Sequence, residues 1–121
     1  MAKVLIVDDS NTLRQMIADV LQKSGFHIDV ASNGLEALKK MESNLPDLVV
    51  MDIVMPEMNG YELCRKIKND PKTGNIPVIM CSTKNEEFDR IWGMKQGADA
   101  YIAKPFHPND LISTVKLLLK G

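Results

Sequence analysis

The chain has 121 residues, of which 45% are hydrophobic and 26% are charged, a composition typical of one globular domain with its own core. Fifteen basic and sixteen acidic side chains give a net charge of −1, which leaves no broad basic field for binding nucleic acid. The apolar run Val4–Val7 is followed at once by Asp8 and Asp9, so it is too short for a membrane span or a signal peptide. We therefore expect one cytoplasmic domain over residues 1–121, without membrane insertion.

Five short, mostly aliphatic runs mark the expected strands in chain order. They are Val4–Val7, Ile28–Ala31, Leu48–Met51, Val78–Cys81 and Tyr101–Ala103. Short, continuously apolar strands are typical of a parallel sheet that is covered on both faces.

Apolar residues recur at helical spacing after each of these runs. In chain order they are Leu13, Met16, Ile17, Val20 and Leu21, then Leu35, Leu38 and Met41, then Leu63 and Ile67, then Phe88, Ile91 and Trp92, and finally Leu111, Val115, Leu118 and Leu119. The alternation predicts an α/β fold of the (βα)5 type, a doubly wound five-stranded parallel sheet with helices on both faces.

Residues at the expected helix ends agree with this pattern. Gly25 and Gly97 stand where the first and fourth helices should end. Asn59 and Thr83 are each followed three residues later by Glu, which predicts helix N-caps at both positions, and Pro108 suits the first turn of the last helix.

The two cysteines, Cys64 and Cys81, are flanked by ordinary core residues. They have neither CxxC spacing nor the surroundings of metal ligands. We expect both to be buried thiols in a reducing compartment.

Polar side chains follow four of the expected strands. These are Asp8 and Asp9, Asp52, Ser82, and Lys104. Ligand sites of open α/β sheets lie outside the carboxyl ends of the strands, so we expect these side chains to meet at one rim. A single Asp after a strand is usually a turn or cap residue. If each of these five residues had only such a local role, their meeting at one edge of the sheet would be a coincidence.

Three carboxylates at one rim repel one another and need a counter-charge. Lys104 supplies one, and a hard divalent cation such as Mg²⁺, with Mn²⁺ as an alternative, would supply another. An Asp carboxylate can attack phosphorus to form an acyl phosphate, while a cation and a lysine offset the charge on the transferred oxygens and a hydroxyl donates to one of them. The expected rim therefore has the parts of a phosphoryl-transfer site.

The sequence resembles response-regulator receiver domains, the stand-alone CheY type of two-component signalling, from Lys3 to Lys120. The segments that carry the resemblance are Val4–Ser10, Asp52–Gly60, Ser82, Gly97–Tyr101 and Lys104–Phe106. The resemblance implies the strand order 2-1-3-4-5. It also implies a signalling protein rather than an enzyme, one that catalyses only its own phosphorylation and dephosphorylation.

The resemblance further implies that Asp52 is the phosphoacceptor and becomes an aspartyl phosphate. By the same similarity, Asp9 and Asp52 would ligate Mg²⁺ directly, together with the main-chain carbonyl of Val54. Asp8 would act through a metal-bound water.

The remaining site residues receive switching roles from the resemblance. Lys104 would pair with the phosphoryl oxygens, and its peptide bond to Pro105 is expected to be cis. Ser82 would move to a phosphoryl oxygen and Tyr101 would turn inward into the space this opens, so that the pair forms a bistable element.

Two positions depart from the chemotaxis pattern within this family. Val54 stands where Asn is frequent, and Lys84 stands where Glu is frequent. These side chains flank the path of the water that attacks the acyl phosphate, and Val54 cannot orient that water by hydrogen bonding. We expect slower hydrolysis here than in fast chemotaxis regulators.

The implied partners are a sensor histidine kinase of the CheA-like kind and a downstream protein target. A receiver uses about all of the 121 residues and leaves no output domain, so we expect the output to be another protein. The resemblance implies that this target binds the face made by the fourth helix, the fifth strand and the fifth helix. Trp92 is expected to pack in the core, with a place on this face as the alternative. The segment Glu86–Gly97 is similar to regulators of type IV pilus twitching and phototaxis, which favours motility or taxis signalling.

Three competing interpretations fit less well. A phosphatase of the haloacid-dehalogenase type needs Asp-x-Asp, but Val54 stands two residues after Asp52. A flavodoxin-like cofactor binder needs a hydroxyl- and glycine-rich loop after the first strand, where Asp8 and Asp9 would repel a phosphate. A degenerate receiver that binds partners without phosphorylation is disfavoured by the complete set of site residues.

Overall fold

Strands and helices alternate strictly along the chain in a computed structural model that describes residues 2–120. The elements are β1 (Lys3–Val7), α1 (Asn11–Lys23), β2 (His27–Ala31), α2 (Gly34–Ser43), β3 (Leu48–Met51), α3 (Gly60–Asn69), β4 (Val78–Ser82), α4 (Glu87–Lys95), β5 (Ala100–Ala103) and α5 (Pro108–Lys120). The bounds of every strand lie within one residue of the apolar runs. No helix within residues 2–120 is long and apolar enough to cross a membrane.

The five strands form one parallel sheet in the order β2-β1-β3-β4-β5. This confirms the predicted fold class and strand order. The central strands β1, β3 and β4 are almost wholly buried, as expected for continuously apolar strands with helices on both faces. Val7 is in register with Met51, so β1 and β3 end at the same level of the sheet.

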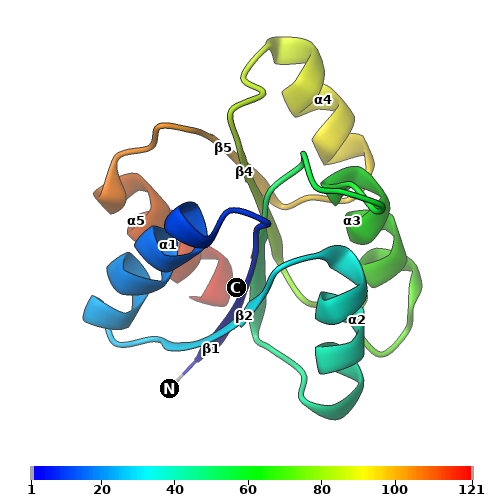
Figure 1. Cartoon of the computed structure of the whole chain (residues 1–121), viewed down its shortest axis with the longest axis horizontal. Helices are drawn as coiled ribbons and strands as arrows, with labels where there is room; N and C mark the ends of the chain where they lie inside the picture. Colours follow the sequence, from blue (N-terminus) through cyan, green and yellow to red (C-terminus); the bar gives the residue numbers. More distant parts are fainter. Residues whose placement is uncertain (1, 121) are drawn as a thin grey trace.

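Two apolar clusters fill the space between the sheet and its helices. Helices α1 and α5 cover one face, and helices α2, α3 and α4 cover the other (Figure 1). Side chains from α1 and α5 pack with one set of alternate strand residues, among them Val4 and Ile6, while α2 and α3 pack with the other set, among them Leu5 and Val7.

Most of the predicted helix ends are confirmed. Gly25 and Gly97 have φ values of +95° and +106°, a backbone conformation that glycine adopts without steric cost. The Asn59 side chain accepts a hydrogen bond of 3.0 Å from the Glu62 amide and so caps α3. Pro108 is the first residue of α5.

The predicted N-cap at Thr83 is wrong, because α4 begins later. Its N-cap is Glu86, whose amide donates a hydrogen bond of 3.3 Å to the carboxylate of Asp89. Strand β4 extends to Ser82, and the main chain of Lys84 is held by side chains of β4 and β5. The segment after Ser82 is therefore fixed as a loop, and the helix can start only beyond it.

Trp92 does not pack in the core, which corrects the preferred expectation for this residue. It is 42% exposed, and Gly93 is the buried residue of α4. A Cβ atom at Gly93 would lie 2.8 Å from Sδ of Met80 and 3.3 Å from the ring of Tyr101. Helix α4 thus approaches the sheet through its glycine, and the neighbouring large side chain faces outward.

Both cysteines are buried with free thiols, as expected. Burial raises the pKa of the Cys64 thiol to about 11 and that of Cys81 to about 12. The thiols keep their protons at neutral pH, so neither is an activated nucleophile.

Candidate functional site

The parallel register of β1 and β3 brings two of the predicted carboxylates together. Asp8 and Asp52 directly follow Val7 and Met51, which are paired across the two strands. The Asp52 amide donates to the carbonyl of Val7 over 3.0 Å, so the ladder continues to the site. The carboxylates are placed by the sheet itself rather than by a flexible loop.

Carboxylate oxygens of Asp8, Asp9 and Asp52 all lie within 4.8 Å of one another. Asp8 is buried, Asp52 is half-buried and Asp9 is exposed. A compact set of hard oxygen donors that is partly open to water suits Mg²⁺, which prefers oxygen ligands and keeps several waters. The donor set therefore fits the expected cation.

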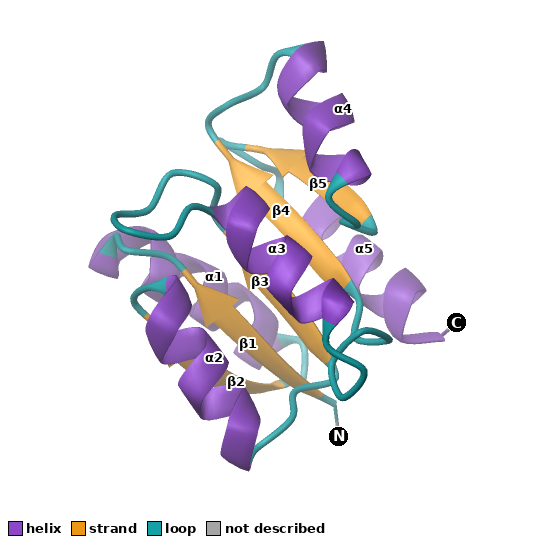
Figure 2. Cartoon of the chain, turned by 90° about the vertical axis from the view of Figure 1, so that its right-hand side faces the viewer, coloured by secondary structure: helices purple, strands orange, loops and turns teal. Residues whose placement is uncertain are grey.

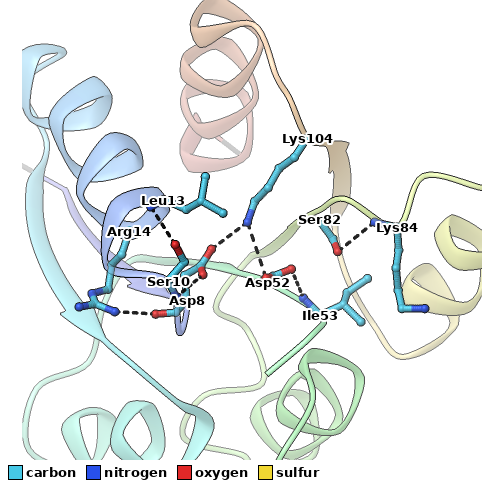
Figure 3. Close-up of polar contacts among 9 residues, drawn as sticks. All are labelled: Asp8, Ser10, Leu13, Arg14, Asp52, Ile53, Ser82, Lys84 and Lys104. Atoms are coloured by element: carbon cyan, nitrogen blue, oxygen red, sulfur yellow. Dashed lines mark hydrogen bonds and ion pairs between the residues drawn. The ribbon is translucent and has the colours of Figure 1, made fainter. Parts of the chain in front are cut away.

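The side chain of Lys104 extends from the end of β5 towards the same rim (Figure 3). Its ammonium nitrogen lies 2.8 Å from Oδ2 of Asp8 and 3.7 Å from Oδ2 of Asp52. The Lys104 side chain is only 4% exposed, and its amide donates to the carbonyl of Ser82 over 2.8 Å. The peptide bond to Pro105 is cis, as expected. Lys104 is thus the buried counter-charge of the cluster.

Ser82 and Tyr101 both contact the main chain of one residue, Lys84. The buried Ser82 hydroxyl accepts a hydrogen bond of 3.3 Å from the Lys84 amide, and the Tyr101 hydroxyl donates to the Lys84 carbonyl. Burial raises the pKa of Tyr101 to about 12, so this hydroxyl keeps its proton and can donate at neutral pH. The two predicted switch residues are therefore linked through the main chain of one residue, Lys84, in the β4–α4 loop.

The carboxylates of Asp8 and Asp52 differ in their access to solvent. The Asp52 side chain keeps 12% of its surface exposed, against 2% for Asp8. Asp52 also lies near the ammonium group of Lys104. Of these two carboxylates, Asp52 is therefore the more accessible to solvent. Val54, two residues further, is exposed, and so is Lys84.

Arg14 and Gly60 belong to the site but were not predicted from the sequence. Nη1 of Arg14 donates to the main-chain carbonyl of Asp8 over 2.8 Å, which fixes the loop after β1. A Cβ atom at Gly60 would lie 2.2 Å from the main-chain oxygen of Asp52, so only glycine fits there. The sequence signals were the position of Arg14 in the first turn of α1 and that of Gly60 directly after a helix cap.

Comparison with known protein families identifies the family that the chain matches. The model of the response regulator receiver domain matches residues 4–116 of the chain.

Two curated relatives and one solved structure illustrate the similarity. The chain is 40% identical to Protein PilH of Pseudomonas aeruginosa, with both chains covered completely. It is 38% identical to the alkaline phosphatase synthesis transcriptional regulatory protein PhoP of Bacillus subtilis, over 98% of this chain and 48% of PhoP. The crystallised chemotaxis protein CheY4 of Vibrio cholerae superposes with a TM-score of 0.91 at 34% identity, with 98% of each chain covered. The chain spans about half the length of PhoP and of several other curated relatives.

Proposed function

The chain belongs to the response regulator receiver domain family, and from that premise we propose that it accepts a phosphoryl group from a histidine kinase on Asp52. Receiver domains are signalling modules that take this group from histidine kinases, and the family gives no support to the haloacid-dehalogenase interpretation. The observation that carries the choice of residue is the position of Asp52, whose side chain is 12% exposed, against 2% for Asp8, and lies 3.7 Å from the Lys104 ammonium group.

In the proposed transfer, an Oδ atom of Asp52 attacks the phosphorus of a phosphohistidine. The new O–P bond forms as the P–N bond breaks, and the electron pair of that bond remains on the imidazole of the kinase, which then takes up a proton. Lys104 offsets negative charge on the phosphoryl oxygens, because its ammonium group already lies between two carboxylates. Asp8 holds Lys104 in this place.

Receiver domains bind Mg²⁺ at an acidic Asp cluster, and the oxygens of this cluster fit the ion. We assign direct contacts to Asp9, Asp52 and the main-chain carbonyl of Val54, with Asp8 acting through a bound water. When bound, the cation would offset charge on the transferred phosphoryl group.

The proposed signal passes from Asp52 to the β4–α4 loop. A phosphoryl oxygen on Asp52 would offer the Ser82 hydroxyl a strong acceptor. Rotation of the Ser82 side chain towards that oxygen would break the hydrogen bond that Ser82 accepts from the Lys84 amide. Tyr101 holds the carbonyl of the same residue, so its hydroxyl must follow or lose its partner. The face made by α4, β5 and α5 would thereby change its affinity for a protein target.

The proposed pathway is motility or taxis signalling with a CheA-like kinase. Its support is the similarity to the chemotaxis protein CheY4 of Vibrio cholerae over 98% of both chains. We place the protein in the cytoplasm, where the free thiols of Cys64 and Cys81 would stay reduced.

The test of the phosphoacceptor is the substitution Asp52→Asn. The wild-type chain should be labelled by acetyl phosphate only when Mg²⁺ is present, and intact-mass spectrometry should find no label on the variant. The amide is nearly isosteric with the carboxylate, so folding should be retained. It is a poor nucleophile, so it should not take up the phosphoryl group. Label on the folded variant would place the acceptor elsewhere.

We also propose a slow loss of the phosphoryl group, because Val54 is exposed beside Asp52 and cannot orient a water. Among residues 2–120 no ion pair joins Lys84 to Asp52, so Lys84 would act by shielding or by pairing with the phosphoryl group itself. Val54→Asn should shorten the half-life of the labelled chain several-fold, whereas Leu45→Asn, at another exposed apolar position, should leave it unchanged. A wild-type half-life of seconds at neutral pH with Mg²⁺ would refute this proposal.

A further inference from the structure

Helix α4 has little apolar anchorage of its own. Gly93 is its buried residue, while Phe88, Ile91, Trp92 and Met94 are all exposed. Apart from the close approach at Gly93, the position of this helix therefore depends on polar contacts with its neighbours.

Helix α3 supplies such contacts at both ends of α4. The hydroxyl of Tyr61 donates to the main-chain carbonyl of Asp89 over 3.3 Å, near the start of α4. Near its end, Arg65 Nη1 donates to the side-chain oxygen of Gln96 over 2.7 Å, and the Cys64 thiol donates to the Gln96 carbonyl over 3.5 Å. Residues 61, 64 and 65 lie on one face of α3, and α3 and α4 lie on the same side of the sheet (Figures 1 and 2).

The start of α3 is fixed on the phosphoacceptor. The Gly60 amide donates to the carbonyl of Ile53 over 2.8 Å. A Cβ atom at Gly60 would lie only 2.2 Å from the main-chain oxygen of Asp52, so the two segments are in direct contact. Tyr61 is the next residue, so a displacement of the Asp52 main chain is passed directly to the residue that holds α4.

Tyr61 is built to keep this contact. Its ring packs against the apolar cluster on the α2–α3 side of the sheet. Burial and the negative charge of Asp89 raise the pKa of Tyr61, so the hydroxyl keeps its proton at neutral pH. The bond reaches a carbonyl within α4, whereas Tyr101 reaches Lys84 in the loop before α4.

We infer that Tyr61 is a positioning residue for α4, and that Asp52, Gly60 and Tyr61 form a second route from the phosphorylation site to this helix beside the Ser82–Lys84–Tyr101 route. The inference rests on the proposed function, because it requires the phosphoryl group to be carried by Asp52. Hydrogen bonds to two different elements then help to position α4, one set made with α3 and the other made in the β4–α4 loop.

The test uses Trp92 in α4, the one tryptophan of the chain, as its probe. In the full chain without phosphodonor, Tyr61→Phe should increase amide hydrogen exchange in residues 87–92 several-fold and increase quenching of Trp92 fluorescence by acrylamide. Thr114→Val removes a comparable hydroxyl-to-carbonyl bond, of 2.7 Å to Asp110 in α5, and should change neither readout. Unchanged exchange and quenching in Tyr61→Phe would overturn the positioning role.

The coupling is tested by adding acetyl phosphate and Mg²⁺. Tyr61→Phe should be labelled to the wild-type extent, but its change in Trp92 fluorescence should fall below half of the wild-type change. Adding Tyr101→Phe should reduce the change further, because the two routes are separate. A full Trp92 response in labelled Tyr61→Phe would overturn the route through α3. A wild-type chain that takes no label would instead overturn the proposed function, and the coupling with it, while the exchange result would still decide the positioning role.

Discussion

The ammonium group of Lys104 lies between the carboxylates of Asp8 and Asp52, and the Lys104 and Asp8 side chains are almost completely buried. Both groups have lost most of their hydration, which costs several kcal/mol for each ion unless the partner compensates for it. Each side chain of the pair is therefore the nearest compensating charge of the other. Removing one partner leaves the other as an uncompensated buried charge.

Lys104→Ala should lower the free energy of unfolding by about 3–5 kcal/mol when measured by urea denaturation in EDTA. Mg²⁺ should restore part of this loss, since a bound cation replaces the missing positive charge beside Asp8. Lys40→Ala is the matched control, because Lys40 pairs with Asp29 at 3.2 Å but both side chains are about one-third exposed. In Lys40→Ala the free energy of unfolding should fall by at most about 1 kcal/mol. Equal losses in the two variants would contradict a buried counter-charge.

At the scale of elements, the β3–α3 connection has the tightest backbone packing near the site. Gly60 begins α3 with its α-carbon against the main chain of Asp52 and Ile53. The atoms that a new Cβ would meet are main-chain atoms of Asp52 and Ile53, which cannot rotate away as a side chain can. The chain thus requires glycine here for space rather than for a left-handed conformation.

Gly60→Ala should therefore destabilise the fold by about 3 kcal/mol, at the upper end of the usual cost of overpacking. Gly25→Ala is the comparison, because Gly25 has φ of +95° but no atom within 4 Å of its Cβ position. In that variant the free energy of unfolding should fall by about 1 kcal/mol, from backbone strain alone. Urea denaturation of both variants measures the difference. A loss at Gly60 no larger than that at Gly25 would show that the α3 start can move away from Asp52.

Sequence patterns located most elements because propensity, apolar periodicity and caps agree there. They failed at α4, where Thr83–Glu86 and Glu86–Asp89 both offer a polar residue followed by an acidic one at cap spacing. The structure selects the second pair, because Ser82 and Tyr101 hold the main chain of Lys84 in the preceding loop. Those contacts come from residues distant in the chain, which a local pattern cannot contain.

At the scale of the whole molecule, sheet topology makes the site predictable. Asp8, Asp52, Ser82 and Lys104 come from four strands, yet the parallel order brings the ends of those strands to one rim. The sequence could not predict the contact of Arg14 with the Asp8 carbonyl. It also could not predict that Lys104 lies nearer to Asp8 than to Asp52. Such choices depend on side-chain rotamers and on burial, which only the packed fold determines.

The same convergence should make the stability of the whole domain depend on Mg²⁺. The carboxylates of Asp8, Asp9 and Asp52 lie within 4.8 Å of one another only in the folded chain, so the ion should bind the folded state much more tightly than the unfolded one. At about one hundred times its dissociation constant, Mg²⁺ should add about 2.7 kcal/mol to the free energy of unfolding. The unfolding temperature should therefore rise by about 10 °C relative to its value in EDTA for a domain of this size.

Asp9→Asn separates this linkage from a general effect of salt. The variant lacks one of three like charges, so in EDTA it should be slightly more stable than the wild-type chain, and Mg²⁺ should then raise its unfolding temperature little. Glu42→Gln removes an exposed carboxylate of α2 and should keep the full wild-type response to Mg²⁺. The two variants change the net charge equally, so only the position of the lost carboxylate distinguishes them. Equal Mg²⁺ responses in Asp9→Asn and Glu42→Gln would mean that the ion acts on the surface at large and not at the rim of the sheet.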